Sequence, residues 1–415
     1  HTNLNSVGFY VIKYHLKRNE QKNHGDKEVL SVYREYGVIP KDSRDDNHNV
    51  TSEDTSKYKY VKKGNLVINK MKAWQGSLAV SEYEGIVSPA YFIYEFTSEK
   101  YYKKYFHYLI RGCYKDEFRR ISGGIREGQW DLSPDEFRKT PILLPPIEEQ
   151  KKIVEFLDDN INTVNSLYNN IQKQIETLKE YKKSIITKAV TKGLNPDVEM
   201  KDSGIEWIGK IPKSWSVTKI KYSTKQIAKG ISPNYTELEK TKIINQATFS
   251  KGYYDTKKQR YANDDFVISK GKVKKNDILL ATTGGGVLGK TYYFQEDGEY
   301  LAATDVAYLR VDESYLSSKF LYYCLSVNYD MFNAIMANGS TNQTHLDMQA
   351  LSNMYVAQPS INEQRAIINT LDDINSKIDG IIQNKNRQLK TLDQYKQSFI
   401  FEYVTGKKAL PYNES

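Results

Sequence analysis

Apolar residues recur at alternating steps of three and four positions after Pro146, and this spacing predicts a helix with one continuous apolar stripe. Pro146 and the acidic Glu148 favour a helix start, and Gly193 favours its end. At ~1.5 Å per residue the helix would be roughly 60 Å long, which favours a coiled-coil rod. The predicted seam consists of Val154, Leu157, Ile161, Val164, Tyr168, Ile171, Ile175 and Leu178.

The same pattern returns near the end of the chain, because Gln150 and Gln364 lie 214 residues apart and their surroundings match in register. Two positions of the second stripe, Asn375 and Lys385, are polar, and polar seam residues fix register and pairing. We therefore expect the two helices to form an antiparallel coiled coil; two independent core helices are the alternative. The second seam consists of Ile368, Leu371, Asn375, Ile378, Ile382, Lys385, Leu389 and Leu392.

The repeat predicts an α+β chain in the order globule, helix, globule, helix, with an internal pseudo-twofold relation. Each globule mixes short strands with helices. In the first, we expect a strand over 85–96, a helix over 100–111 and a helix capped by Ser133. The predicted division is 1–145 and 205–359 for the two α/β globules, 146–193 and 360–406 for the helices, 194–204 for a linker and 407–415 for a tail.

Charge and composition indicate which class of partner the chain binds and in which compartment it works. The formal charge of +9 and the pI near 9.0 favour a polyanionic partner, although solubility alone is a competing explanation. Cys113 and Cys324 lie far apart, which indicates a reducing compartment. No apolar run reaches ~18 residues and no signal peptide is evident, so we expect a cytoplasmic protein without membrane contact.

The segment from Gly284 to Thr291 matches the pattern of a phosphate-binding loop, which needs a strand before it and a helix directly after it. The residues that follow, Tyr292 to Phe294, are aromatic and favour a strand. We therefore interpret the glycines as a hairpin turn. The acidic residues around Glu199 faintly resemble a nuclease signature, but they sit within one linker, and we interpret them as solvated charge.

Motifs for catalysis are otherwise missing from the sequence. It has no glycine-rich dinucleotide fingerprint and no methyl-donor motif, and its six histidines show no metal-ligand spacing. We therefore expect a protein that is not an enzyme by itself and that has neither cofactor nor metal.

Two polar loops and two hairpins, at equivalent places in the globules, are the best candidates for a binding function. Arginine, glutamine and asparagine make bidentate contacts with base edges, and small hydroxyls contact phosphates. A surface loop with ordinary turn chemistry is the competing explanation. The candidate DNA-binding residues are Lys72, Trp74, Gln75, Arg126, Gln129, Thr282, Thr283, Ser340, Thr341, Asn342, Gln343 and His345.

The whole chain resembles the DNA-specificity subunit of a type I restriction-modification system. The resemblance rests on the helix starts PPIEEQKKIVEFLD and PSINEQRAIINTLDD and on the linker GLNPDVEMKDSGIEWIGKIPKSW. The family usually has a similar opening before its first domain. Here that opening is missing, which makes a truncated N-terminus one interpretation and leaves the early fold of the first globule open.

The resemblance implies two target-recognition domains that each read half of a bipartite, asymmetric site in double-stranded DNA. It implies that the helices set the gap, that two DNA-methyltransferase subunits dock along them, and that restriction and translocase subunits join the full complex. Two other readings remain: a protein-binding scaffold with two heads on a rod, and a fragment of a fused restriction enzyme.

Overall fold

The computed structural model describes residues 8–22, 24–34, 36–43, 54–124, 130–284, 286–329, 332, 337–338 and 345–411. The chain divides into two compact units, one formed by 1–172 with 386–415 and the other by 173–385. Two long helices, α4 (Ile147–Lys192) and α8 (Ile361–Val404), contribute residues to both units. Their bounds differ by one or two residues from the expected 146–193 and 360–406.

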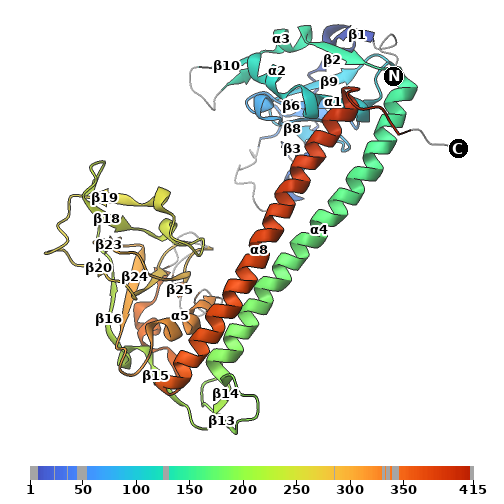
Figure 1. Cartoon of the computed structure of the whole chain (residues 1–415). Coiled ribbons are helices and arrows are strands. Elements are labelled where there is room, and N and C mark those ends of the chain that lie inside the picture. Colours follow the sequence, from blue (N-terminus) through green and yellow to red (C-terminus); the bar gives the residue numbers. More distant parts are fainter. Residues whose placement is uncertain are drawn as a thin grey trace. The chain divides into compact units, whose positions relative to one another are not determined.

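The first unit is built on a four-stranded antiparallel sheet in the order β2-β9-β6-β7 (Figure 1). Four antiparallel pairs surround it: β1 with β12, β3 with β4, β5 with β8, and β10 with β11. The strands are β1 (Gly8–Val11), β2 (Leu16–Asn19), β3 (Leu30–Tyr33), β4 (Gly37–Pro40), β5 (Lys59–Val61), β6 (Leu66–Asn69), β7 (Leu78–Val80), β8 (Gly85–Val87), β9 (Tyr91–Phe96), β10 (Ser122–Gly123), β11 (Asp131–Leu132) and β12 (Pro141–Leu144). The helices are α1 (Lys103–Cys113), α2 (Lys115–Arg120) and α3 (Pro134–Lys139), with the 3₁₀ turns η2 (Ile12–Tyr14), η3 (Lys41–Ser43) and η4 (Ala73–Gln75).

The single strand expected over 85–96 was wrong. Residues Ser88, Pro89 and Ala90 separate β8 from β9, and the two strands pair with different partners. Proline lacks the N–H that a central strand must donate, which explains the break. The cap at Ser133 is confirmed, because its hydroxyl accepts the backbone N–H of Glu136 at 3.3 Å.

The core of the first unit includes the end of the chain's last helix. Phe106, Phe118 and Leu157 belong to one buried cluster with Phe399 and Val404 of α8. The Tyr105 hydroxyl, which is buried on α1, donates a hydrogen bond of 2.8 Å to the Val404 carbonyl. The first globule is therefore completed by residues almost three hundred positions downstream.

The second unit repeats this frame. Its four-stranded sheet has the order β16-β24-β21-β22, which is equivalent to β2-β9-β6-β7, and a five-stranded sheet β17-β19-β18-β23-β20 lies beside it. The pair β18–β23 is parallel. The strands are β13 (Met200–Asp202), β14 (Lys210–Pro212), β15 (Ser216–Lys219), β16 (Thr224–Lys229), β17 (Tyr235–Thr236), β18 (Thr241–Ile244), β19 (Arg260–Ala262), β20 (Lys272–Val273), β21 (Ile278–Ala281), β22 (Thr291–Tyr293), β23 (Tyr300–Ala302), β24 (Val306–Val311), β25 (Ala337–Asn338), β26 (His345–Leu346) and β27 (Tyr355–Gln358). The helices are α5 (Ser318–Ser326) and α7 (Met348–Asn353), with 3₁₀ turns η5 (Ile220–Tyr222), η6 (Gln246–Thr248) and η7 (Thr256–Lys258).

The segment expected as a linker is partly structured. Strand β13 pairs with β14, and the chain then buries Trp215 completely in the core of the second unit. The Trp215 indole donates a hydrogen bond of 3.1 Å to Glu363 Oε1 on α8. Gly193, just after α4, has φ +76°, and a side chain there would approach the Trp215 ring at 3.1 Å. Glycine therefore fits both the turn and the packing.

The two long helices run antiparallel, as expected from the repeat. In the second unit, Lys385 donates to Gln174 and Lys182 pairs with Asp379 at 2.7 Å, so rising numbers on α4 meet falling numbers on α8. In the first unit, Lys396 donates to Asn165 at 2.8 Å. All sixteen expected seam residues are buried or half-buried. Asn375 is buried in the seam close to the Tyr323 hydroxyl of α5, and its Oδ1 has no hydrogen-bond partner among the described residues.

Each globule is joined to its long helix by one buried glutamine. Gln150 Oε1 accepts the Tyr102 N–H at 2.9 Å, and its amide donates to the carbonyls of Lys100 and Pro145. Gln364 makes the equivalent three contacts, with the Ser317 N–H and the carbonyls of Tyr315 and Pro359. Both glutamines are 0% exposed. The repeat therefore conserves the junction between globule and helix.

A second repeated contact lies two turns further along each helix. Asp158 accepts hydrogen bonds from Lys104 and Tyr108 of α1. Asp372 accepts the same pair from Lys319 and Tyr323 of α5. A charged acceptor that binds two donors from one neighbouring helix fixes that helix in orientation as well as in position.

Replacing Gln364 by leucine should destabilise the second unit by about 2–4 kcal/mol, because the Ser317 N–H and the Pro359 carbonyl lose their partner and a buried unpaired group costs about 1–3 kcal/mol. The Tyr315 carbonyl still accepts a hydrogen bond from Gln358. Urea unfolding followed by tryptophan fluorescence measures this, since Trp215 lies in the same core. The control is Gln172→Leu, an exposed position on α4. Equal stability of Q364L and wild type would contradict the assigned role.

Candidate nucleic-acid interface

In the first unit, the turn between β6 and β7 contacts the end of the polar loop that joins β10 to β11. The Leu132 N–H donates to the Lys70 carbonyl at 2.8 Å, and Lys70 Nζ lies 3.4 Å from Asp131. The rings of Trp74 and Trp130 have their centroids 5.5 Å apart. The two candidate regions of the sequence therefore form one surface.

The second unit brings its equivalent regions together in the same way. The Leu346 N–H donates to the Thr282 carbonyl at 2.9 Å, which matches the contact between Leu132 and Lys70. An isolated antiparallel bridge joins Thr283 to His345. One backbone frame thus presents two different sets of side chains.

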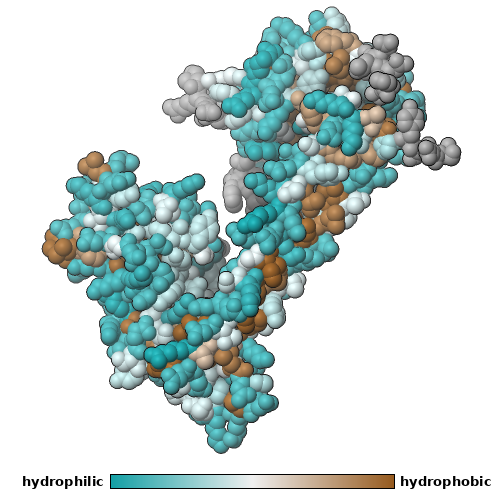
Figure 2. All heavy atoms as spheres, viewed as in Figure 1, coloured by the Kyte–Doolittle hydropathy of each residue, from teal (hydrophilic) through white to brown (hydrophobic). Residues whose placement is uncertain are grey.

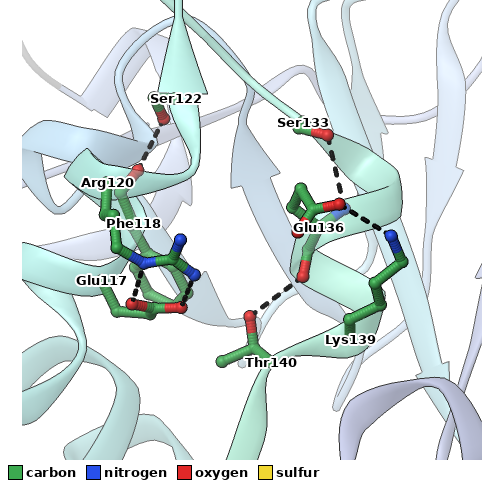
Figure 3. Close-up of polar contacts among 8 residues, drawn as sticks. All are labelled: Glu117, Phe118, Arg120, Ser122, Ser133, Glu136, Lys139 and Thr140. Carbon is green, nitrogen blue, oxygen red and sulfur yellow. Dashed lines mark hydrogen bonds and ion pairs between the residues drawn. The ribbon is translucent and has the colours of Figure 1, made fainter.

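Side-chain contacts lie on both sides of the first polar loop (Figure 3). On α2, Glu117 accepts two hydrogen bonds from Arg120, and the Ser122 hydroxyl donates to the Phe118 carbonyl at 2.7 Å. Across the loop, Ser133 caps α3, and Lys139 pairs with Glu136 at 2.8 Å. The Ser122 hydroxyl and the Ser133 cap therefore fix the residues where β10 begins and β11 ends, whereas the Glu117–Arg120 pair stays within α2.

The three expected residues on the first hairpin differ in how exposed their side chains are and in the hydrogen bonds that they already make. Lys72 is exposed. Trp74 is half-buried, and its indole N–H donates to the Met71 carbonyl at 3.1 Å. Gln75 is half-buried, and its Oε1 accepts from Arg34 Nη2 at 2.9 Å. Arg126 and Gln129 lie outside the described residues.

The expected residues of the second unit also differ. Thr282 is fully buried, and its hydroxyl donates to the Thr304 carbonyl. Thr283 is half-buried and donates to Gln246 Oε1 at 3.3 Å, and His345 is exposed. The remaining candidates, Ser340, Thr341, Asn342 and Gln343, lie outside the described residues.

Sequence reasoning missed Gln246 and Asp305, which complete the second surface. Asp305 Oδ2 accepts the Gln246 N–H at 3.1 Å, and the Asp305 carbonyl accepts the Thr282 N–H at 2.9 Å. Burial raises the pKa of the Asp305 carboxyl, and its Oδ1 has no hydrogen-bond partner among the described residues. The available signal was weak: an acid directly before the apolar strand β24.

The glycine-rich segment of the second unit is a turn between strands. Strand β22 begins at Thr291, where a phosphate-binding loop would need a helix, so the arrangement of amides that cradles a phosphate is not formed. Within the described residues, no group of three or more histidine, cysteine or acidic side chains is placed to hold a metal ion. The described helices include none that is long and apolar enough to cross a membrane.

Comparison with known proteins gives a consistent picture. The model of the family "Type I restriction modification DNA specificity domain" matches residues 8–177 and 225–391. The chain is 26% identical over 289 residues to the type I restriction enzyme MjaVIII specificity subunit of Methanocaldococcus jannaschii, a match that covers 65% of this chain and 63% of that protein. It is 24% identical over 326 residues to the EcoBI specificity subunit of Escherichia coli, covering 75% and 67%.

A solved structure shares the fold. The chain is similar to a protein chain in the structure described as "Structural basis underlying complex assembly and conformational transition of the type I R-M system". The TM-score is 0.68 and the sequences are 14% identical, and the match covers 96% of this chain and 97% of that one. The chain spans less than two thirds of the MjaVIII subunit.

The half-buried carboxylate of Asp305, with one oxygen that has no partner among the described residues, predicts a pH-dependent effect of Asp305→Asn. A raised folded-state pKa means that ionisation opposes folding, and this cost is absent at low pH and complete above the folded pKa. We therefore expect the stability of D305N relative to wild type to increase between pH 4 and pH 7. Thermal unfolding at both pH values measures the difference, with the exposed Asp297→Asn as control. A difference that falls with rising pH would contradict the burial argument.

Proposed function

Because this chain belongs to the family of type I restriction-modification DNA specificity domains, we propose that it reads a bipartite target in double-stranded DNA, one half-site with each unit. DNA target recognition is the general function of the family. The observation that carries the bipartite reading is the repeated contact of hairpin and loop, through Leu132 and Lys70 in one unit and Leu346 and Thr282 in the other.

The two surfaces share a backbone frame and differ in chemistry. The first presents Lys72, Trp74 and Gln75, whereas the second presents Thr283 and Gln246 with Asp305 behind them. Surfaces with different side chains fit different DNA sequences, so the two half-sites should differ and the whole target should be asymmetric. The net charge of +9 supports contact with phosphates and predicts that binding weakens steeply with salt.

We assign methyl transfer and cleavage to partner subunits. A partner that binds in two copies needs the same docking surface twice. The long helices carry such a repeated surface. Leu167 and Ile381 are exposed apolar residues 214 positions apart, and Tyr181 and Tyr395 form a second such pair. The hydrogen bond between Asn165 and Lys396 places Leu167 and Tyr395 at the same level of the helix pair.

Figure 2 shows apolar side chains along the outside of the long helices. The register in the second unit, set by Lys182 and Asp379, likewise places Tyr181 level with Ile381. On its segments of α4 and α8, each unit therefore carries one exposed large aliphatic side chain and one exposed tyrosine. We propose that two copies of a methyltransferase subunit dock on these side chains. One copy contacts Leu167 and Tyr395, and the other contacts Tyr181 and Ile381.

The spacing of the two half-sites should follow the length of the helix pair. We expect that deleting residues 169–175 of α4 together with 386–392 of α8 removes one heptad from each and shortens the pair by about 10 Å. At ~3.4 Å per base, the gap should shrink by about three base pairs while both half-sites persist. Methylation mapping in cells that express the chain with its methyltransferase subunit measures both quantities.

The same experiment distinguishes a DNA-specificity subunit from a protein-binding scaffold. An altered half-site after the deletion would contradict the role of the helices as spacer. If the undeleted chain shows no split motif at all, DNA reading itself fails, and a protein-binding scaffold becomes the better explanation.

Replacing Leu167 and Ile381 together by aspartate should prevent co-purification of the methyltransferase subunits, because two charges would be buried in apolar contacts. The matched control is Gln172→Asp with Asn386→Asp, which are exposed, equivalent positions that gain the same charge. Size-exclusion chromatography with light scattering reports how many partner copies bind. Unchanged binding of two copies by L167D/I381D would place the docking surface elsewhere.

A further inference from the structure

A cavity of about 310 Å³ opens between η4 and α2 in the first unit. It is lined by Arg34, Trp74, Gln75, Lys115, Asp116 and Arg119. Its size is at the lower end of the ~300–1,000 Å³ range of small-ligand sites. Three cations face one carboxylate, so the lining favours an anion.

Helix α2 carries three cationic side chains. One of them is neutralised by an ion pair, and the other two can bind an anion. Arg120 binds Glu117 through two hydrogen bonds. Lys115 and Arg119 are four residues apart, hence on one face of the helix, and both line the cavity. Among the described residues, neither has a carboxylate within ion-pair distance. Their charge is therefore directed to the cavity and not to a neighbour.

The third cation is fixed by a side-chain contact. Arg34 Nη2 donates to Gln75 Oε1 at 2.9 Å, and the Arg34 carbonyl accepts a hydrogen bond from Arg111. The Gln75 oxygen is thus bound to a guanidinium, and the N–H groups of its amide stay available. Reading an adenine edge would require this same oxygen to accept a hydrogen bond from the base as well, so this conformation of Gln75 is poorly suited to base reading.

The indole of Trp74 supplies an apolar wall. Its N–H is bound to the Met71 carbonyl, and the ring lies against Trp130, so the indole offers the cavity carbon surface and no donor. Apart from the Asp116 carboxylate, the polar atoms left to the cavity are donors on Arg34, Gln75, Lys115 and Arg119. A ligand that matches them has acceptors only and carries negative charge.

We propose that this cavity binds a backbone phosphate of the DNA, with Arg34, Lys115 and Arg119 around the phosphate oxygens and Trp74 against the adjoining deoxyribose. Phosphate oxygens are acceptors only, whereas base edges mix donors with acceptors. The inference rests on the proposed function and deepens it. It assigns Trp74 and Gln75 to positioning the duplex and leaves base reading to other residues.

The test uses the complex assembled with its methyltransferase subunits and compares Arg119→Gln with Arg120→Gln. We expect R119Q to weaken binding of target and non-target duplexes by the same factor, about tenfold at low salt, and to reduce the slope of log K against log salt by about 1. R120Q, whose wild-type charge is paired with Glu117, should leave affinity and slope unchanged. Lys115→Gln with Arg119→Gln should reduce the slope by about 2.

The outcomes are distinct. A loss confined to one base position would overturn the phosphate assignment in favour of base reading, and an unchanged slope would overturn it outright. Equal effects of R119Q and R120Q would show that net charge and not the cavity matters. If the wild-type complex prefers no split target, the proposed function fails, yet the slopes measured on non-target duplex still decide whether the cavity binds phosphate. Circular dichroism and urea unfolding confirm that each variant is folded.

Discussion

Backbone groups buried where a globule meets a long helix must be hydrogen-bonded, and the rest of the structure depends on how this chain meets that requirement. Gln150 satisfies one N–H and two carbonyls at a junction from which water is excluded. Gln364 does the same in the second unit. Because each unpaired group would cost about 1–3 kcal/mol, the junction tolerates little change. The two halves of the chain are accordingly most alike here.

Away from the junction, the two units differ more, and the extent of the difference depends on the role of each region. The four-stranded sheets keep one strand order, since they carry the hairpin that meets the polar loop. The smaller sheets differ: the first unit has the separate pairs β3–β4 and β5–β8, whereas the second has a five-stranded sheet with one parallel pairing. The surface side chains differ most. A common frame that presents unlike side chains is what recognition of two unlike sequences requires.

Much of the architecture could be predicted, because the heptad pattern and the repeat report on long, regular elements. The break at Pro89 was missed because the apolar run on either side looked continuous. Asn375 was interpreted as a seam residue, and its position close to Tyr323 of α5 could not be predicted before the globule was placed. Residue types suggested Gln75 for base reading, but its bond to Arg34, distant in sequence, decides what it can offer. Gln246 and Asp305 come together only through the fold.

The bond between Tyr105 and Val404 has a consequence for synthesis on the ribosome. The second unit comprises one uninterrupted stretch, 173–385, and all its core residues are available before the last turns of α8 are made. The first unit contains Phe399, Tyr403 and Val404 in its core, so the globule that is translated first is completed last. Until then its apolar surface stays open. Domains usually fold in the order of their synthesis. Here the globule that is translated first waits for the codons of Phe399 to Val404, and a chain that terminates before them leaves it unfinished.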